Sequence, residues 1–267
     1  YGPDGFELAS LSAGLGRAAL SAVLDGSLKN AYALTRPPGH HCLPDWQNGF
    51  CLLANIAIAI EAAFAQGKAE RIAVLDWDVH HGNGTEAIFY DRADVLTISM
   101  HQENNYPLDT GRVEDRGEGA GLGLNVNIPL PPGLGHRSWI SALERIVLPA
   151  MRAFKPDAIV IASGFDAAAF DPLGRMLCTV ETFVEMTRRV LALADDVCDG
   201  KVAMIHEGGY SEVYVPFCGH GVIAEMAGSD TAAPDPFADT LRKRQPGAAL
   251  EAWAESQITE MAEALIA

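Results

Sequence analysis

The sequence has no apolar run long enough to cross a bilayer, and no charged segment followed by an apolar one opens it. These absences argue against a membrane-spanning helix and a secretory leader, so we expect a soluble cytoplasmic protein without a membrane partner. The five cysteines form no CxxC pair, which argues against disulfides and a structural zinc site built from thiolates. We expect most of them to be reduced and buried. They are Cys42, Cys51, Cys178, Cys198 and Cys218.

Basic side chains are also few. The chain carries 19 Lys and Arg against 35 Asp and Glu, which gives a formal net charge of −16. A nucleic-acid partner needs basic patches that neutralise phosphates, so we expect none. The acidic balance favours a neutral or cationic ligand, although an acidic surface that serves solubility explains it equally well. Assembly into a homo-oligomer stays open.

Strand-like and helix-like segments alternate along all 267 residues without an obvious linker. This pattern favours one α/β domain over residues 1–267, with a parallel sheet covered on both faces. Apolar or largely apolar runs predict strands at 31–34, 72–75, 95–100, 124–128, 158–162 and 202–205. Helical spacing predicts helices at 6–24, 50–65, 138–154, 180–197 and 250–266, with a surface excursion at 229–247.

Four polar clusters follow predicted strands. Because the carboxyl ends of parallel strands meet at one edge of a sheet, we expect these clusters to lie close together. They are RPPGHH (36–41), DWDVHHGNG (76–84), SGFD (163–166) and EGGY (207–210).

The second cluster is the most informative. Strand alternation would direct Asp76, Asp78 and His80 to one side, and buried carboxylates beside an imidazole need a cation to offset their cost. With Asp166, the ligands Asp78 and His80 make the three that a hydrolytic metal site needs. The alternatives are a capped strand end with solvated acids, and Asp166 as a helix N-cap.

Proton transfer needs further groups, and the adjacent His40 and His41 are the candidates. Asp76 and Asn83 are available to fix their tautomers. Tyr210, beside two glycines, has a hydroxyl that can donate to a developing oxyanion. Together these groups indicate a metal-assisted amide hydrolase. Taken singly, the histidine pair also fits a polar surface loop and the GGY segment an ordinary turn.

The ordered motifs resemble the zinc-dependent histone deacetylase superfamily. The similarity is greatest to its class II branch, with the bacterial histone deacetylase-like amidohydrolases and the acetylpolyamine amidohydrolases. The motifs are RPPGHHC (36–42), NGFC (48–51), VLDWDVHHGNGT (74–85), SMHQ (99–102), IPLPPG (128–133), IASGFDAAAFDPLG (161–174) and HEGGY (206–210).

The resemblance implies a three-layer arginase/deacetylase-like α/β fold with a central, mainly parallel eight-stranded sheet and helices on both faces. Family members carry a further segment ahead of the point that matches Tyr1, with the first strand and a loop at the tunnel mouth. We therefore expect a single deacetylase-like catalytic domain without the N-terminal portion of the family domain.

The resemblance also assigns roles to the site residues. Zinc would be bound by Asp78, His80 and Asp166, although two carboxylates and one imidazole are a hard set that also admits Fe²⁺ or Co²⁺. His41 would be the general base and acid, and His40 would assist electrostatically.

Further assignments come from the same resemblance. Tyr210 would donate to the transition state, Asp76 would pair with His40 and Asn83 with His41. A structural potassium ion would be bound by oxygens of Asp76, Asp78, His80, Ser99 and Met100, and a second by backbone oxygens near Phe89, Arg92 and Val95.

The acyl-lysine tunnel of the family is walled by aromatic side chains. Phe50, next to Gly49, matches one wall, and Leu173 matches a position at the rim. Tyr106 takes the place of the usual second Phe, which puts a hydroxyl near the channel mouth.

The implied reaction is removal of acetyl or another short acyl group from lysine side chains or polyamines by attack of a zinc-bound water. The substrates would be acetylated lysine peptides, acetylpolyamines or related small amides. A catalytically weak acyl-lysine-binding protein of the same fold is one alternative. A di-manganese ureohydrolase is another, but it needs additional Asp and His ligands, typically in a DAHxD arrangement.

Overall fold

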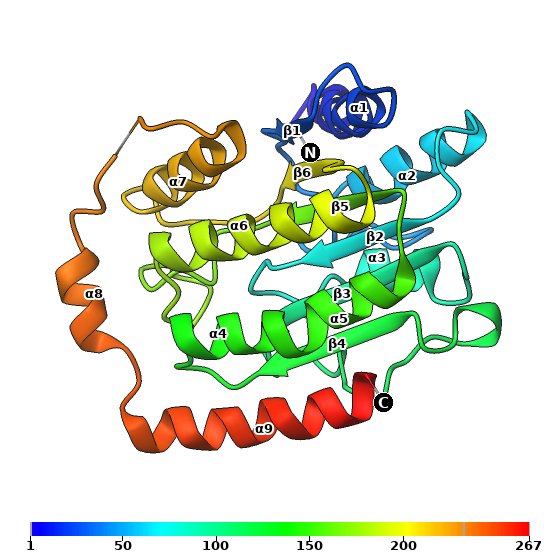
Figure 1. Cartoon of the computed structure of the whole chain (residues 1–267). Coiled ribbons are helices and arrows are strands. Elements are labelled where there is room, and N and C mark those ends of the chain that lie inside the picture. The colour runs from blue at the N-terminus through cyan, green and yellow to red at the C-terminus, as the bar shows by residue number, and fades with distance from the viewer. Residues whose placement is uncertain (1, 232, 267) are drawn as a thin grey trace.

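The computed structural model describes residues 2–231 and 233–266, which form a parallel β-sheet between two layers of helices (Figure 1). The strand order is β1-β6-β5-β2-β3-β4, and every neighbouring pair is parallel. The strands are β1 (Asn30–Ala33), β2 (Ile72–Asp76), β3 (Val95–Gln102), β4 (Asn125–Leu130), β5 (Ala158–Ser163) and β6 (Val202–His206).

The three-layer α/β architecture is confirmed, but the expected number of strands is wrong. The described residues form six strands rather than eight. The six apolar runs in the sequence correspond to these six strands, whereas the number eight was carried over from the whole domain of the resembling family. The apolar runs were the better guide because a parallel strand buried on both faces has few polar positions.

Alternate side chains of the strands enter two separate cores. Leu75 of β2 and Ile161 of β5 belong to one core, and their neighbours Val74 and Val160 belong to the other. This alternation is the period of two that a β-strand imposes. Each face of the sheet therefore needs its own layer of helices.

One face is covered by the helices α1 (Gly5–Leu24), α2 (Asn55–Ala65) and α3 (Asn83–Phe89). The other is covered by α4 (His136–Ala142), a π-helical turn (Leu143–Val147), α5 (Leu148–Phe154), α6 (Val180–Val197) and α7 (Val215–Ala227). The helix α9 (Ala248–Ile266) packs outside α4, and α8 (Ala238–Arg244) connects it to α7 (Figure 1).

Three predicted segments differ from the structure. The helix expected from residue 50 begins at Asn55, because Phe50 has a φ of 66° next to a bridge that pairs Asn48 with Cys51. The helix expected at 138–154 is interrupted by the π-helical turn. The excursion at 229–247 contains α8, which buries Leu241 against the core.

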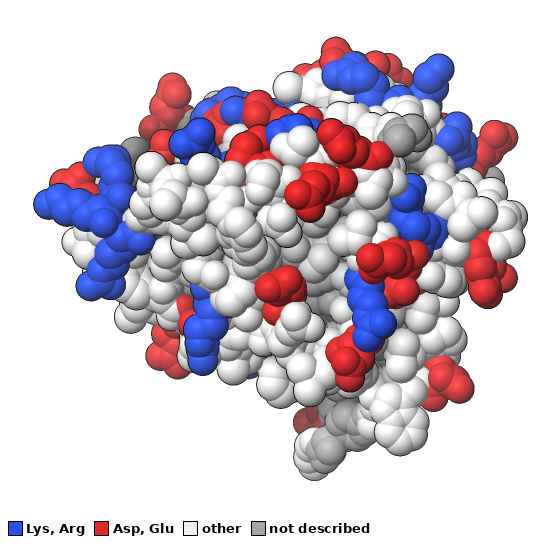
Figure 2. Space-filling view, turned by 90° about the horizontal axis from the view of Figure 1, so that it is seen from below, with Lys and Arg blue, Asp and Glu red and all other residues white. Residues whose placement is uncertain are grey.

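Charged side chains are interspersed on the face shown in Figure 2. Asp and Glu side chains lie beside Lys and Arg in several places, uncharged surface covers the centre, and no continuous basic surface crosses this face among the described residues. None of the helices in residues 2–231 and 233–266 combines the length and the apolar character that crossing a bilayer requires.

The stability of the fold rests on the larger core, and Phe183 tests it. This side chain of α6 is fully buried and packs edge-on against Phe165, with ring centroids 5.2 Å apart. We expect Phe183→Ala to lower the free energy of unfolding by about 3–5 kcal/mol, because it leaves a cavity. Phe6→Ala is the control, since Phe6 is 73% exposed and its loss should change stability by less than about 0.5 kcal/mol. Denaturant unfolding of both variants measures this, and equal effects would contradict the assignment of the core.

Candidate active site

The four polar clusters meet at the carboxyl edge of the sheet, as the sequence predicts. In the strand register Asp76 of β2 pairs with Ala162 of β5, and Ser163 pairs with His206 of β6. The segments that follow these strands carry the acidic residues and tyrosine of the motifs. The histidine-bearing loop follows β1, the other neighbour of β6.

Asp78, His80 and Asp166 form a compact buried cluster. Nδ1 of His80 lies 3.0 Å from Oδ1 of Asp78 and 3.0 Å from Oδ2 of Asp166. All three side chains are buried, and Oδ2 of Asp166 has no hydrogen-bond partner. Two carboxylates in this setting need a cation, so the donor set fits a divalent metal ion. A capped strand end with solvated acids does not agree with this burial.

Strand alternation is not what brings Asp78 and His80 together. The strand β2 ends at Asp76, and residues 77–80 bend away from it. The carboxylate of Asp76 is turned instead toward His40. The prediction of one shared strand face is therefore wrong in its reason, because alternation applies only within an extended strand.

Backbone amides hold the two carboxylates in place. The N–H of Gly208 donates to Oδ2 of Asp78 over 2.8 Å, and the N–H of Val79 donates to Oδ1 of Asp166 over 2.8 Å. A Cβ at Gly164 or Gly208 would overlap these carboxylates, so only glycine allows this close approach. Asp166 caps no helix, since the next helix along the chain, α6, begins at Val180.

This arrangement disfavours the charged form of Asp166. Burial and the neighbouring Asp78 carboxylate together raise the pKa of Asp166 to about 7. Two like charges in a buried place resist ionisation unless a positive charge lies between them. A bound divalent cation would supply that charge.

The two adjacent histidines have different partners. Nδ1 of His40 lies 2.8 Å from Oδ2 of Asp76, and Nδ1 of His41 lies 2.8 Å from Oδ1 of Asn83. Because the Asn83 oxygen can only accept, Nδ1 of His41 carries the proton and its Nε2 remains free as a base. Their rings are 4.0 Å apart.

The surroundings of the two histidines also give them different protonation states. Burial lowers the pKa of His40, but the Asp76 and Asp78 carboxylates outweigh it and raise the pKa to about 10. Burial and the nearby His40 charge lower the pKa of His41 well below its usual value. His40 is thus suited to remain cationic, and His41 to act as a neutral base.

A cavity of about 520 Å³ opens over His41 and His80. The ring of Tyr106 stands edge-on to His41 at 5.0 Å, and its hydroxyl donates to Oδ1 of Asn48 over 2.6 Å. Gly49 has a φ of 48°, and a Cβ there would overlap the His41 ring. The cavity is lined by His41, Gly49, Phe50, His80, Asn105, Tyr106, Leu173 and Tyr210.

Two carboxylates that position this site were not assigned roles from the sequence. Asp171 accepts hydrogen bonds from the N–H groups of Leu173 and Tyr210, at 2.9 and 2.6 Å, and so joins the rim to the tyrosine. Glu207 accepts from the N–H groups of Gly39 and His40, at 2.7 and 3.1 Å. The signal for both is an acidic residue inside a recognised motif, DPLG and HEGGY.

The histone deacetylase domain model matches residues 2–226, which is most of the chain. The chain belongs to the histone deacetylase family. A histone deacetylase-like amidohydrolase from Pseudomonas aeruginosa is 54% identical over 98% of this chain and 69% of its own length. A probable deacetylase from Archaeoglobus fulgidus is 44% identical over 92% of this chain and 69% of its own length.

A solved structure has the same fold. The crystal structure of the HDA15 HD domain superposes with a TM-score of 0.81 at 36% identity, covering 96% of this chain and 70% of that one. Family membership supports a hydrolase of the deacetylase or amidohydrolase type and does not favour the ureohydrolase alternative. The helices α8 and α9 lie outside the matched residues.

The predicted potassium ligands lie beside the cluster of Asp78, His80 and Asp166. Asp76 and Ser99 are direct neighbours in the register of β2 and β3, and Ser99 Oγ lies 2.9 Å from Nδ1 of His101. At the second position, the carbonyl of Phe89 accepts a hydrogen bond from the N–H of Arg92. Potassium at both places stays a prediction.

His101 makes the stability of the chain depend on pH. Burial and the nearby His81 lower the pKa of His101 from 6.5 to about 3, while its ring bonds Ser99 and the carbonyl of Gly111. Between these values the unfolded chain binds a proton that the folded chain does not, so stability falls as pH falls. Denaturant unfolding should show that the free energy of unfolding of His101→Gln falls less steeply with falling pH in this window than that of the unmodified chain. An unchanged pH slope would contradict the assignment.

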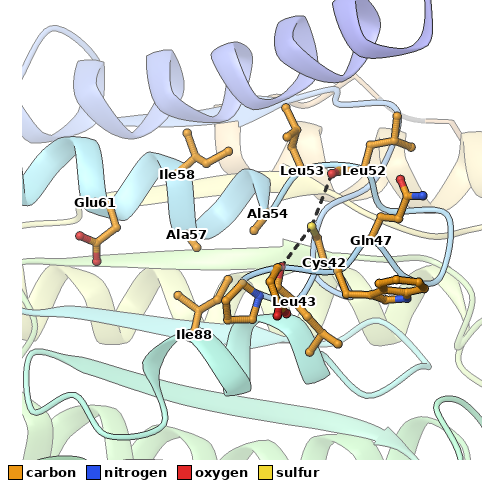
Figure 3. A pocket seen from close by; sticks show the side chains of 13 residues that line it. Cys42, Leu43, Gln47, Leu52, Leu53, Ala54, Ala57, Ile58, Glu61 and Ile88 are labelled. Atoms are coloured by element: carbon orange, nitrogen blue, oxygen red, sulfur yellow. Dashed lines mark hydrogen bonds between the residues drawn. The ribbon is translucent and has the colours of Figure 1, made fainter.

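A cavity larger than the one lined by His41 and His80 lies elsewhere. A groove of about 690 Å³ runs between residues 42–47 and α2, and Ile58 and Ile88 line it with Cys42 (Figure 3). The thiol of Cys42 hydrogen-bonds the carbonyls of Leu43 and Leu52 there. Cys42 therefore faces this groove, while the Cys51 sulfur accepts a hydrogen bond from the N–H of His41.

Proposed function

We propose that the chain is a metal-dependent amidohydrolase that removes acetyl or other short acyl groups from lysine side chains or polyamines. The observation that carries this proposal is one shared cavity, which His41, His80 and Tyr210 all line. A metal ligand, a neutral base and a phenolic donor thus reach the same space, which is the set of groups that amide hydrolysis requires.

Asp78, His80 and Asp166 would hold the metal ion, and zinc is the ion that we propose. When bound, it would polarise the amide carbonyl and make the attacking water more acidic. The hard donor set also accommodates Fe²⁺ or Co²⁺. Metal analysis of protein purified without added metal distinguishes these, and iron in place of zinc would overturn the zinc assignment.

His41 moves the proton in this mechanism. Its Nε2, left free by the Nδ1–Asn83 bond, accepts a proton from the attacking water and later gives it to the departing amine. His40 stays charged through its bond to Asp76 and stabilises negative charge that develops beside it. Each histidine therefore has the protonation state that its role needs.

Tyr210 donates to the developing oxyanion. Burial and the Asp78 and Asp166 carboxylates raise the pKa of its hydroxyl, so it remains protonated at neutral pH. The carboxylate of Asp171 holds the backbone N–H of Tyr210 and fixes the loop. A preorganised donor of this kind stabilises the transition state more than the planar amide.

The cavity walls suit a slender, extended substrate. The rings of Phe50 and Tyr106 line it together with Leu173 at the rim, and they would pack along the methylene groups of a lysine or polyamine chain. The overall charge of −16 favours such cationic molecules. A cytoplasmic location and assembly into a homo-oligomer remain predictions.

A turnover panel tests the function. Acetyl-lysine peptide, trifluoroacetyl-lysine peptide, acetylputrescine and acetylspermidine are each incubated with the metal-loaded chain, and the released carboxylic acid is measured. We expect at least one substrate to be hydrolysed, and the preferred one defines the substrate class. If the metal-loaded chain binds an acetyl-lysine peptide but hydrolyses none of the four, it is a binding protein and the proposed function is wrong.

A further inference from the structure

A second group of metal-ligating side chains lies behind the catalytic histidines. One ligand atom each of His40, Cys51 and Glu207 lies within 4.8 Å of the others. The three come from the loop after β1, the segment before α2 and the segment after β6. Their exposed fractions are 2%, 2% and 4%, so the group is enclosed by the protein.

Glu207 has one carboxylate oxygen without a partner. Its Oε2 accepts the N–H groups of Gly39 and His40, but its Oε1 is buried and accepts no hydrogen bond. An unsatisfied buried carboxylate oxygen is costly and unusual in a native structure. A cation among the three side chains would satisfy it.

The donor atoms match a borderline-soft divalent ion. An imidazole nitrogen, a thiol sulfur and a carboxylate oxygen are all ligands of Zn²⁺ in proteins, at about 2.0–2.3 Å from the ion. The set is softer than that of Asp78, His80 and Asp166, which contains no sulfur. It therefore offers zinc or cobalt a second place to bind.

A neighbouring cavity borders one member of this group. Glu207 lines a cavity of about 400 Å³, and Phe50, Leu173 and Tyr210 line both this cavity and the catalytic one. Only these side chains of the described residues are common to the two cavities. The proposed substrate channel thus also leads toward the second group.

We propose that His40, Cys51 and Glu207 form a second divalent-metal site whose occupation inhibits the enzyme. On binding, the Cys51 thiol and the His40 imidazolium each give one proton to solvent, and the thiolate, the freed imidazole nitrogen and the Glu207 carboxylate ligate the ion. An ion bound through the ring of His40 takes the place of the imidazolium charge beside Asp78. Oδ1 of Asp78 lies 3.8 Å from Nε2 of His40. The inhibition, but not the binding, rests on the proposed function.

The second site should fill after the catalytic one. Burial raises the pKa of the Cys51 thiol, so forming the thiolate costs free energy that the catalytic carboxylates do not require. We therefore expect inhibition to begin only when metal exceeds the amount that the catalytic cluster binds.

Cobalt binding tests the site without any turnover. The metal-stripped chain is dialysed against Co²⁺, and bound metal and absorption are measured together. We expect the chain to bind a second equivalent, accompanied by near-ultraviolet thiolate-to-cobalt charge-transfer absorption. Cys51→Ala should lose that equivalent and the absorption, whereas Cys42→Ala, the matched control at the groove, should keep both. Asp166→Ala should lose the other equivalent and retain the absorption.

A Glu207→Gln variant and a zinc titration of turnover test the second site further. Glu207→Gln retains an acceptor for the Gly39 and His40 N–H groups, so it tests the site if Cys51→Ala does not fold, and we expect weaker binding of the second equivalent. As zinc is added, turnover by the unmodified chain should rise and then fall, whereas turnover by Cys51→Ala should rise without the later fall. Failure of the proposed function would abolish turnover but not the absorption. Unchanged absorption in Cys51→Ala, or a single bound equivalent in the unmodified chain, would overturn the second site.

Discussion

Asp166→Asn is expected to bind the catalytic metal far more weakly and to lose turnover by about a thousandfold or more, since several kcal/mol of charge stabilisation depend on that ion. Oδ2 of Asp166 has no hydrogen-bond partner and lies 3.0 Å from Nδ1 of His80, so it is the ligand least replaceable by another contact. Metal content and turnover are measured on the same preparations.

The metal-stripped form of this variant separates loss of metal from loss of fold. Burial and Asp78 raise the pKa of Asp166 to about 7. Without metal, the ionised carboxylate therefore destabilises the folded chain. Asp166→Asn should therefore be at least as stable as the unmodified chain when both are stripped. Asp199→Asn, at an exposed carboxylate, is the control and should change neither property. Full metal binding by Asp166→Asn would contradict the ligand assignment.

Tyr210→Phe is expected to lower kcat by about 10²–10³, the usual cost of removing one oxyanion donor. The variant keeps the ring that lines the cavity and the backbone bond to Asp171, so metal content and KM should change little. Steady-state kinetics on the preferred substrate of the panel measures both constants.

Tyr106→Phe is the matched control for that prediction. Tyr106 lines the same cavity, but its hydroxyl is directed to Asn48. Loss of this hydroxyl should remove about one net hydrogen bond. KM should therefore rise by roughly tenfold at most. If Tyr210→Phe retained full kcat, the tyrosine would have no role in the transition state.

The sequence predicts the sheet well because parallel strands are buried on both faces. The run Ile72–Asp76 is apolar up to its last residue, and no amphipathic period is needed to recognise it. The failures have local causes. The segment at Phe50 is as apolar as the helix that follows it, yet its backbone takes a positive φ to bring Gly49 against His41.

The helices α3 and α7 were not predicted, and both have weak helix signals. The helix α3 begins within the GNG segment, and α7 contains Gly219 and Gly221. Glycine disfavours a helix by about 1 kcal/mol relative to alanine, so tertiary packing decides these segments. Gly221 shows this, since a Cβ there would press against Val184 of α6.

The site was predictable where it depends on topology. Asp166 and His80 come from different strand ends, and the rule that parallel strands end at one edge was enough to bring them together. The supporting carboxylates were not predictable in this way. Glu207 contacts the N–H of Gly39, 168 positions away in the chain, and such a bond has no local pattern.

In the proposed mechanism, hydrolysis by this chain depends on a metal ion held by Asp78, His80 and Asp166. The test measures acetate released from the preferred substrate of the panel by chelator-stripped protein, as zinc is added back to the protein. We predict no release from the stripped chain and a rise in proportion to zinc until the catalytic cluster is filled. Turnover by the stripped chain at the rate of the metal-loaded chain would show that hydrolysis does not need this metal.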